Sequence, residues 1–343
     1  MRFAVTGALI FASSALLLAW QLPGPRPEQD QGAGDEPVIR INVDLVNIFF
    51  NVKTKKGGRL VPGLNKEDFK IFEDSKEQTI KAFTRESDLP LTLGLLIDIS
   101  ASQENLIEIE RQAASQFFST VIRPKDEAFL ISFGKSTDLL QDYTSSPRLL
   151  SSALKDLRGD GQTPMIAGSP VPVNTGPIGG SIGTPKGTLL FDAVYLASDE
   201  KLKREVGRKA LILITDGEDQ GSTYKIHDAI EAAQKSDAII YSIYYVDRGF
   251  YAQYGAGVGG GEGDLRKMSE QTGGHVFKVD SKHPLNQVFQ EIQDELRNQY
   301  SISYTPVSTS RDGSFRRIEI KVDNPEDRVQ AREGYFATKN DAE

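Results

Sequence analysis

Apolar and polar residues follow two different periods along the chain. In "VIRINVDLV", residues 38–46, apolar side chains occupy every second position, which predicts a half-buried strand. The stretches "IFFNVKT", "DFKIFED" and "TIKAFT" come next, and the same period returns after about residue 300 in "YSISYTP", "FRRIEIKV" and "VQAREGYF". The sequence therefore predicts an N-terminal β segment over residues 38–88 and a C-terminal β segment over residues 299–338.

The residues between these segments have the pattern of an α/β protein. Short apolar runs such as "LTLGLLID", "EAFLISFG" and "KALILITD" alternate with helical patterns such as "NLIEIERQAASQFFSTVI", in which apolar residues recur every three or four positions. Uniformly apolar strands that alternate with helices are typical of a parallel sheet covered on both faces. We therefore predict a doubly wound, mostly parallel, Rossmann-like α/β domain over residues 89–298.

Neither β segment is large enough to bury much apolar surface by itself. We expect the two segments to pair into one small β-sandwich, with the α/β domain inserted between them in the sequence. Two separate small sheets are the alternative, and the sequence does not decide between the two arrangements.

The N-terminus is similar to an export signal. In residues 1–22, Arg2 supplies a positive charge near the start, and a nearly uncharged apolar run follows it. Cleavage after Ala19 would leave Leu17 where a small residue is usual, so an uncleaved membrane anchor is an alternative. Residues 23–37, rich in proline, glycine and acids, predict a disordered linker. We expect an exported protein, located in the periplasm or cell envelope or secreted.

Charge and composition exclude several classes of function. The chain has 40 Lys and Arg residues and 48 Asp and Glu residues, which gives a formal net charge of -8. This balance argues against a nucleic-acid-binding protein, which would present a basic face to phosphates. The chain has no cysteine, so it has no disulfide, no thiolate metal site and no cysteine nucleophile.

Oxygen-bearing side chains follow two of the predicted strands. "LGLLIDISAS" ends in Asp98, Ser100 and Ser102, "KALILITDGED" ends in Asp216, and "GTLLFD" places Thr188 at the start of a helix. Ligands of open α/β sheets bind beyond the carboxyl ends of the strands, so we expect these side chains to converge. Carboxylate and hydroxyl oxygens suit a hard divalent cation, above all Mg²⁺, with a position left open for an oxygen of a partner.

Each of these residues also has a structural explanation. Ser102 and Thr188 are suitable helix N-caps, which is compatible with metal binding. Asp216 and Gly217 form a common turn pair, and Asp98 is an ordinary turn acid at a strand end. The joint pattern favours the metal site, because all of these residues occur in the order and context that such a site needs.

With these motifs in place, residues 91–298 resemble a von Willebrand factor A (VWFA) domain with a metal-ion-dependent adhesion site (MIDAS). The resemblance implies that Ser100, Ser102 and Thr188 bind Mg²⁺, or else Mn²⁺ or Ca²⁺. It also implies that Asp98 and Asp216 bind directly or through water, and that an Asp or Glu carboxylate of a protein partner completes the coordination shell.

Both β segments add to this resemblance. The stretches "GRLVPGLNKEDFKIFEDSKEQTIKAF" and "QYSISYTP" are similar to the exported VWFA-related family of acidobacterial genomes. Ala101 departs from the glycine of many members, and the insert before Thr188 is unusually long. Asp192 and Asp219 are further candidates near the metal, although solvated acids are the simpler explanation of both.

The sequence favours recognition of a protein partner over catalysis. Its three histidines are not placed near the predicted metal loops, and no Gly-x-Ser-x-Gly, P-loop or His-Glu-x-x-His motif is present. We expect a protein that acts in adhesion, as a scaffold or in envelope assembly, and not an enzyme. A metal-dependent hydrolase and a structural envelope protein with a vestigial metal site are the alternatives.

Two glycine-rich stretches, 159–187 and 248–263, are expected on the metal face, since long loops in a compact domain are usually functional or disordered. The second contains three aromatic residues, Phe250, Tyr251 and Tyr254. Aromatic side chains dominate interface hot spots, so these are candidate anchors for a partner. The alternative is that they pack under their own loop.

Overall fold

The computed structural model describes residues 45–86, 89–159, 187–253 and 260–337. The predicted export signal, the predicted linker and Tyr254 lie outside the described residues, as does most of the insert before Thr188. Among the helices of the described part, none is both long and apolar enough to cross a membrane. The described residues belong to one compact unit of the chain.

A six-stranded sheet forms the centre of the α/β domain, with the strand order β10-β9-β8-β5-β6-β7. Its strands are β5 (Leu91–Asp98), β6 (Glu127–Phe133), β7 (Thr137–Thr144), β8 (Arg208–Thr215), β9 (Ala238–Tyr244) and β10 (Val276–Lys278). All of them run parallel except β7, which pairs with β6 in the antiparallel direction. The predicted doubly wound, mostly parallel α/β domain is confirmed.

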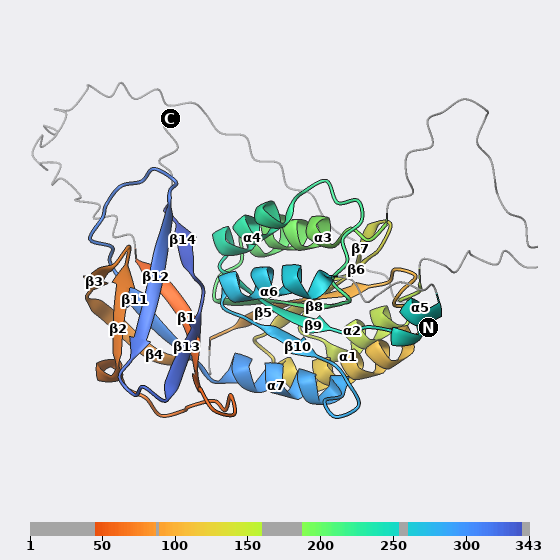
Figure 1. Ribbon diagram of the computed structural model, residues 1–343, viewed down its shortest axis with the longest axis horizontal. Coiled ribbons are helices and arrows are strands. Elements are labelled where there is room, and N and C mark those ends of the chain that lie inside the picture. The colour runs from red at the N-terminus through yellow and green to blue at the C-terminus, as the bar shows by residue number, and fades with distance from the viewer. Residues whose placement is uncertain (1–44, 87–88, 160–186, 254–259, 338–343) are drawn as a thin grey trace, which may run out of the picture. The chain divides into compact units, whose positions relative to one another are not determined.

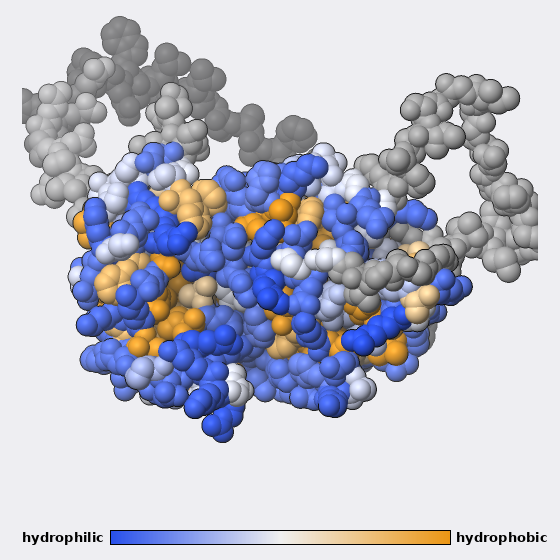
Figure 2. Space-filling model, in the orientation of Figure 1, coloured by the Kyte–Doolittle hydropathy of each residue, from blue (hydrophilic) through white to orange (hydrophobic). Residues whose placement is uncertain are grey.

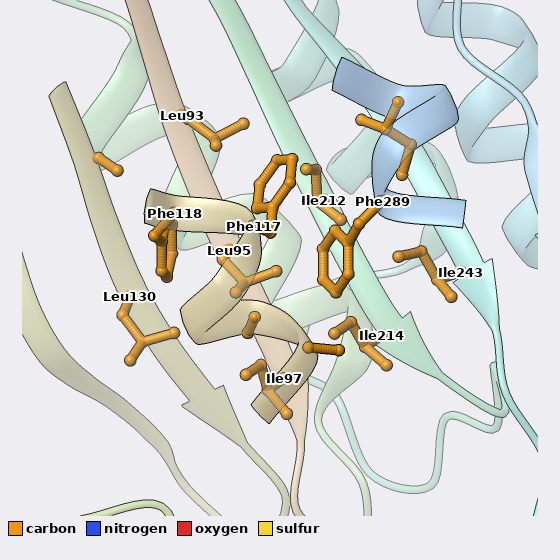
Figure 3. Close-up of a cluster of buried hydrophobic side chains, with 14 of the residues drawn as sticks. Leu93, Leu95, Ile97, Phe117, Phe118, Leu130, Ile212, Ile214, Ile243 and Phe289 are labelled. Carbon is orange, nitrogen blue, oxygen red and sulfur yellow. The ribbon is translucent and has the colours of Figure 1, made fainter. Parts of the chain in front are cut away.

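Helices cover both faces of the central sheet (Figure 1). They are α1 (Ile107–Val121), α2 (Pro147–Leu154), α3 (Leu190–Leu196), α4 (Ile226–Lys235), α6 (Gly261–Thr272) and α7 (Leu285–Arg297), while the short helix α5 (Arg248–Gln253) buries no residue. Helices α1, α2 and α7 share one apolar core with the sheet, and α3, α4 and α6 share another on the opposite face. Figure 3 shows Phe117 of α1 and Phe289 of α7 over the strands, with ring centroids 4.5 Å apart.

Strand β5 lies in the middle of the sheet, between β8 and β6, and every one of its residues is buried. Gly94 lets the neighbouring side chains close over it, since a Cβ at this position would lie 2.4 Å from the Phe129 ring. The apolar run of β5 therefore packs on both faces, which fixes its carboxyl end, and with it Asp98, at the centre of one sheet edge.

Three parts of the α/β domain differ from the sequence prediction. Strand β7 was not predicted, because its half-exposed residues lack a regular alternation. The sequence pattern of residues 189–202 predicts one continuous helix, whereas the structure divides this stretch into α3 and a π-helix, Ala197–Leu202. Helix α5 forms at the start of a stretch that we expected to be irregular.

Two four-stranded sheets hold the remaining strands, in the orders β13-β1-β11-β4 and β14-β12-β2-β3. These strands are β1 (Val46–Thr54), β2 (Phe69–Glu73), β3 (Lys76–Gln78), β4 (Ile80–Glu86), β11 (Gln299–Tyr304), β12 (Phe315–Val322), β13 (Asp327–Ala331) and β14 (Gly334–Phe336). Strands from before and after the α/β domain pair within both sheets, as β1 with β11 and β2 with β12. One apolar core lies between the two sheets, which form a β-sandwich.

The surface between these elements is mainly polar. On the face shown in Figure 2, hydrophilic side chains predominate and apolar side chains show in several separate areas between them. The large apolar side chains that are exposed come from unconnected elements, for example Ile109 of α1, Val206 and Phe315 of β12. Isolated exposed apolar residues of this kind are normal on a protein surface.

Candidate metal site

Strands β5 and β8 are neighbours in the sheet, and they bring two carboxylates to the same edge. Their parallel register pairs Ile97 with Ile214, so that Asp98 ends β5 where Thr215 ends β8. Asp216 follows immediately, and both carboxylates are buried, with exposed fractions of 0% and 2%. The carboxyl ends of the two apolar runs therefore meet as the sequence predicts.

Hydrogen bonds join the two serines to these carboxylates. The Ser102 hydroxyl donates to Oδ2 of Asp216 at 2.6 Å, and its Oγ lies 3.1 Å from Oγ of Ser100. The backbone N–H of Ser100 donates to Oδ1 of Asp98 at 2.9 Å. Asp98, Ser100, Ser102 and Asp216 thus form one continuous cluster of oxygen atoms.

Neighbouring side chains hold the carboxylates in place. The Thr215 hydroxyl donates to Oδ2 of Asp98 at 2.6 Å and accepts the backbone N–H of Gly217 at 2.9 Å. The amide of Gln103 donates to Oδ2 of Asp216 at 3.0 Å and to the carbonyl of Tyr245 at 3.2 Å. Because each carboxylate has a fixed partner on the protein side, its remaining lone pairs have a defined direction.

Thr188 reaches the same sheet edge through its backbone. The Thr188 carbonyl accepts the backbone N–H of Gln220, in the loop after Asp216, at 2.8 Å. The backbone N–H of the following residue, Leu189, donates to the carbonyl of Gly134, which follows β6. The Thr188 side chain is buried. None of the hydrogen bonds found among the described residues joins its hydroxyl to the other predicted ligands.

Two of the structural explanations considered for these residues are wrong. Helix α1 begins at Ile107 with Leu106 as its N-cap, so Ser102 does not cap it. Helix α3 has Leu189 as its N-cap, so Thr188 is not the capping residue either. The hydroxyl of Ser102 is instead engaged with Asp216.

The two carboxylates repel one another. Burial, followed by the nearby charge of Asp216, raises the pKa of Asp98 to about 7. Within the described part of the chain, neither carboxylate forms an ion pair with Lys, Arg or His. A cation at this point would offset the repulsion and stabilise the ionised form of both carboxylates.

The donor atoms fit a hard divalent cation. They are carboxylate and hydroxyl oxygens, without nitrogen or sulfur, which is the ligand set that Mg²⁺, Mn²⁺ and Ca²⁺ accept. Groups of three or more His, Cys, Asp or Glu suited to a metal are absent from the residues that the structure describes. A cation here would therefore depend on the serine hydroxyls, water and a further ligand to complete its shell.

Asp192 and Asp219 serve the loop after Asp216 and do not bond the cluster directly. Asp219 accepts the backbone N–H of Phe191 at 3.2 Å, and Asp192 accepts the backbone N–H of Tyr224 at 2.8 Å. Both bonds tie that loop to the first turn of α3, which follows Thr188. These acids position two of the chain segments that carry predicted ligands.

The sequence interpretation missed Glu110, on the inner face of α1. Its side chain is fully buried, and both carboxyl oxygens lack a hydrogen-bond partner among the described residues. Burial, and then the charges of Asp98 and Asp216, raise the pKa of Glu110 well above its ordinary value. An acid on the apolar stripe of a helix was the sequence signal that could have identified it.

Helix α5 reaches the cluster through Tyr251. The Tyr251 hydroxyl donates to Oδ2 of Asp216 at 2.9 Å. Asp247 accepts backbone N–H groups of the first turn of α5, and its other oxygen accepts the Asn105 amide at 2.7 Å. Phe250 packs edge-on against Tyr251, with ring centroids 5.6 Å apart. The start of the second glycine-rich stretch therefore lies on the metal face.

Comparisons with known proteins give similarity in structure only. No family model and no curated protein matches the chain. The chain is similar to the conserved hypothetical protein BatB from Bacteroides thetaiotaomicron, with 18% identity, a TM-score of 0.43, and coverage of 60% of this chain and 97% of that one.

Two further solved structures show a similar degree of likeness. Proximal thread matrix protein 1 from the mussel byssus, with a zinc-occupied MIDAS motif, has 15% identity and a TM-score of 0.46, covering 66% of this chain and 50% of that one. The vWF domain of the type V pili tip protein Mfa5 from Porphyromonas gingivalis has 13% identity and a TM-score of 0.42, covering 61% and 95%. At these values the likeness carries no argument about function.

Proposed function

We propose that this protein binds a divalent cation at Asp98, Ser100, Ser102 and Asp216 and uses the cation to capture an acidic residue of a protein partner. The observation that carries the proposal is the pair of buried carboxylates, bonded to hydroxyls, with no basic partner in the described part of the chain. Such a cluster is costly without a cation and becomes favourable with one.

The cation supplies the chemistry of capture. Mg²⁺ prefers six oxygen ligands and is rarely enclosed by protein oxygens alone, so a partner carboxylate can replace a water in its shell. The chain carries a formal net charge of -8, which by itself repels an acidic partner. The bound cation places a concentrated positive charge where the partner must approach. Thr188 is the candidate for a further protein ligand.

Specificity comes from the surface around the cation, because a carboxylate–metal bond does not distinguish between partners. Tyr251 and Phe250 border the site and are the described aromatic candidates for this contact, with Tyr254 as a third candidate from the sequence. The role is binding in adhesion, as a scaffold or in envelope assembly outside the cytoplasmic membrane, and not catalysis.

A pair of short peptides tests the proposal. The probes are acetyl-Gly-Asp-Gly-amide and its Asn analogue, with binding followed by nuclear magnetic resonance in Mg²⁺ and in EDTA. We expect the Asp peptide to bind only in Mg²⁺, and the Asn peptide to bind in neither condition. The variant Asp98→Ala should lose this binding, and the matched variant Asp142→Ala, at an exposed acid of β7, should keep it. Equal binding of both peptides, or binding that survives EDTA, contradicts the proposal.

Hydrolysis is the competing function and needs its own assay. The same protein is incubated with ester, phosphate and peptide substrates, with Asp98→Ala as the control. We expect no turnover that depends on Asp98. Mg²⁺-dependent turnover that disappears in the variant would replace the binding role with a catalytic one.

A further inference from the structure

Arg248 lies on the same face of α5 as Tyr251. The two residues are three positions apart in one helix, which places their Cβ atoms about 5–6 Å from each other. The Tyr251 hydroxyl bonds Oδ2 of Asp216, so this face of α5 is turned toward the metal site. Arg248 is exposed, and together with Tyr251 it lines a cavity at this side of α5.

A cavity of about 480 Å³ lies at this point, between α5 and the ends of β9 and β10. Its lining includes Tyr244, Arg248, Tyr251, Glu262, Lys278 and Asp280. Tyr251 therefore borders both the metal site and the cavity. A partner segment that reaches the metal over Tyr251 meets this cavity next.

Most charged groups of the cavity have hydrogen-bond or ion-pair partners among the described residues. Glu262 is paired with Lys278 at 2.7 Å and with Arg266. Asp280 accepts hydrogen bonds from the backbone N–H groups of Lys282 and His283. These two bonds, first that of Lys282 and then that of His283, lower the pKa of Asp280. Arg248 forms no ion pair with any residue that the structure describes. Arg248 is therefore the cationic side chain of this cavity that is available to an acidic group of a partner.

We propose that the cavity beside α5 is a second acid-binding subsite, in which Arg248 takes another carboxylate of the partner segment whose first carboxylate binds the metal. This inference rests on the proposed function and defines its partner as a segment with two acidic residues. In an extended chain, residues i and i+2 point to the same side and lie about 7 Å apart. An extended segment of this kind presents two carboxylates to the same side, which is the partner that we propose.

The test compares peptides with one and two acids. The probes are acetyl-Gly-Asp-Gly-Asn-Gly-amide and acetyl-Gly-Asp-Gly-Asp-Gly-amide, titrated in Mg²⁺ against the whole protein. We expect the two-acid peptide to bind about two- to fivefold more tightly, the gain that an exposed ion pair gives. Arg248→Gln should remove this ratio and Arg248→Lys should keep part of it. Arg148→Gln, at an exposed arginine of α2 outside the cavity, is the matched control and should leave the ratio unchanged.

The outcomes separate this inference from the proposed function. If the one-acid peptide binds in Mg²⁺ and the second acid adds nothing, the subsite is wrong and the metal-dependent capture stands. The subsite is also wrong if Arg248→Gln leaves the ratio as it is. If neither peptide binds in Mg²⁺, the capture mechanism itself fails.

Discussion

A buried ion pair that joins the β-sandwich to the α/β domain allows a quantitative test of the packing. Lys53 lies in β1 and Glu295 in α7, and Nζ and Oε1 are 2.6 Å apart with side chains only 6% and 5% exposed. Burial lowers the pKa of Lys53 and raises that of Glu295, while their mutual attraction opposes both shifts. Both charges are therefore desolvated, and each depends on the other.

The variant Lys53→Met leaves the Glu295 carboxylate buried with weak support. One neighbour is the Gln330 amide, which donates to Oε2 at 3.2 Å. Others are the Asn51 side chain and His275, whose Nε2 lies 3.5 Å from Oε1 and whose pKa is lowered chiefly by its own burial, which persists in the variant. Removing one partner of a buried pair costs about 3–5 kcal/mol of unfolding free energy. The double variant Lys53→Met with Glu295→Leu loses both charges and should lie within about 2 kcal/mol of the wild type.

The assay is urea unfolding at pH 7 for the wild type, both single variants and the double variant. A constant slope against urea shows that the same surface unfolds in each. Lys321→Met, at an exposed lysine of β12, is the control and should cost no more than about 0.5 kcal/mol. If Lys53→Met costs under about 1 kcal/mol, or if the double variant costs the sum of the single ones, the reasoning is refuted.

Two further predictions concern the surroundings of the metal site. Burial raises the pKa of Glu110, so the folded metal-free chain holds this proton to higher pH than the unfolded chain. Protonated Glu110 thus contributes to stability at low pH, and this contribution is lost as pH rises above about 4.5. The free energy of unfolding should fall there by up to about 1.4 kcal/mol per pH unit on account of Glu110, and Glu110→Gln should remove this dependence. Parallel stability–pH curves for both proteins in EDTA would contradict this. Gly217 has a φ of +80°, and a Cβ added to it would lie 2.6 Å from the backbone of Gly261 in α6. Gly217→Ala should therefore displace the neighbouring Asp216 and weaken Mg²⁺ binding. Gly260→Ala, where an added Cβ meets nothing within 4 Å, is its control, and equal Mg²⁺ affinities of the two variants would count against the close contact.

The parts of the site that follow strands could be predicted from the sequence. Asp98 and Asp216 each end an apolar run, and the carboxyl ends of neighbouring parallel strands meet at one edge. Ser100 and Ser102 follow Asp98 so closely that the same turn carries them. Local pattern was sufficient here because the apolar run, the strand and its end are all local features.

The parts that depend on distant contacts could not be predicted. Tyr251 bonds Asp216 only because α5 forms at the start of a glycine-rich stretch that has no helical period. Strand β7 has no regular alternation, since the edge of the sheet is half exposed. The pairing of β1 with β11 joins residues more than two hundred positions apart; we expected the two β segments to pair, but the sequence did not decide between this arrangement and two separate sheets.

Mg²⁺-dependent thermal stability is the measurement that tests the central claim most directly. At about a hundred times its Kd, Mg²⁺ should add roughly 2.7 kcal/mol to the stability of the domain that binds it, and should raise Tm by about 5–10 °C. Asp98→Ala and Ser100→Ala should abolish this shift, while Glu319→Ala, at an exposed carboxylate of β12, should leave it unchanged. A shift of equal size in Asp98→Ala would place the cation elsewhere, and the absence of any shift in the wild type would contradict a divalent cation site at this sheet edge.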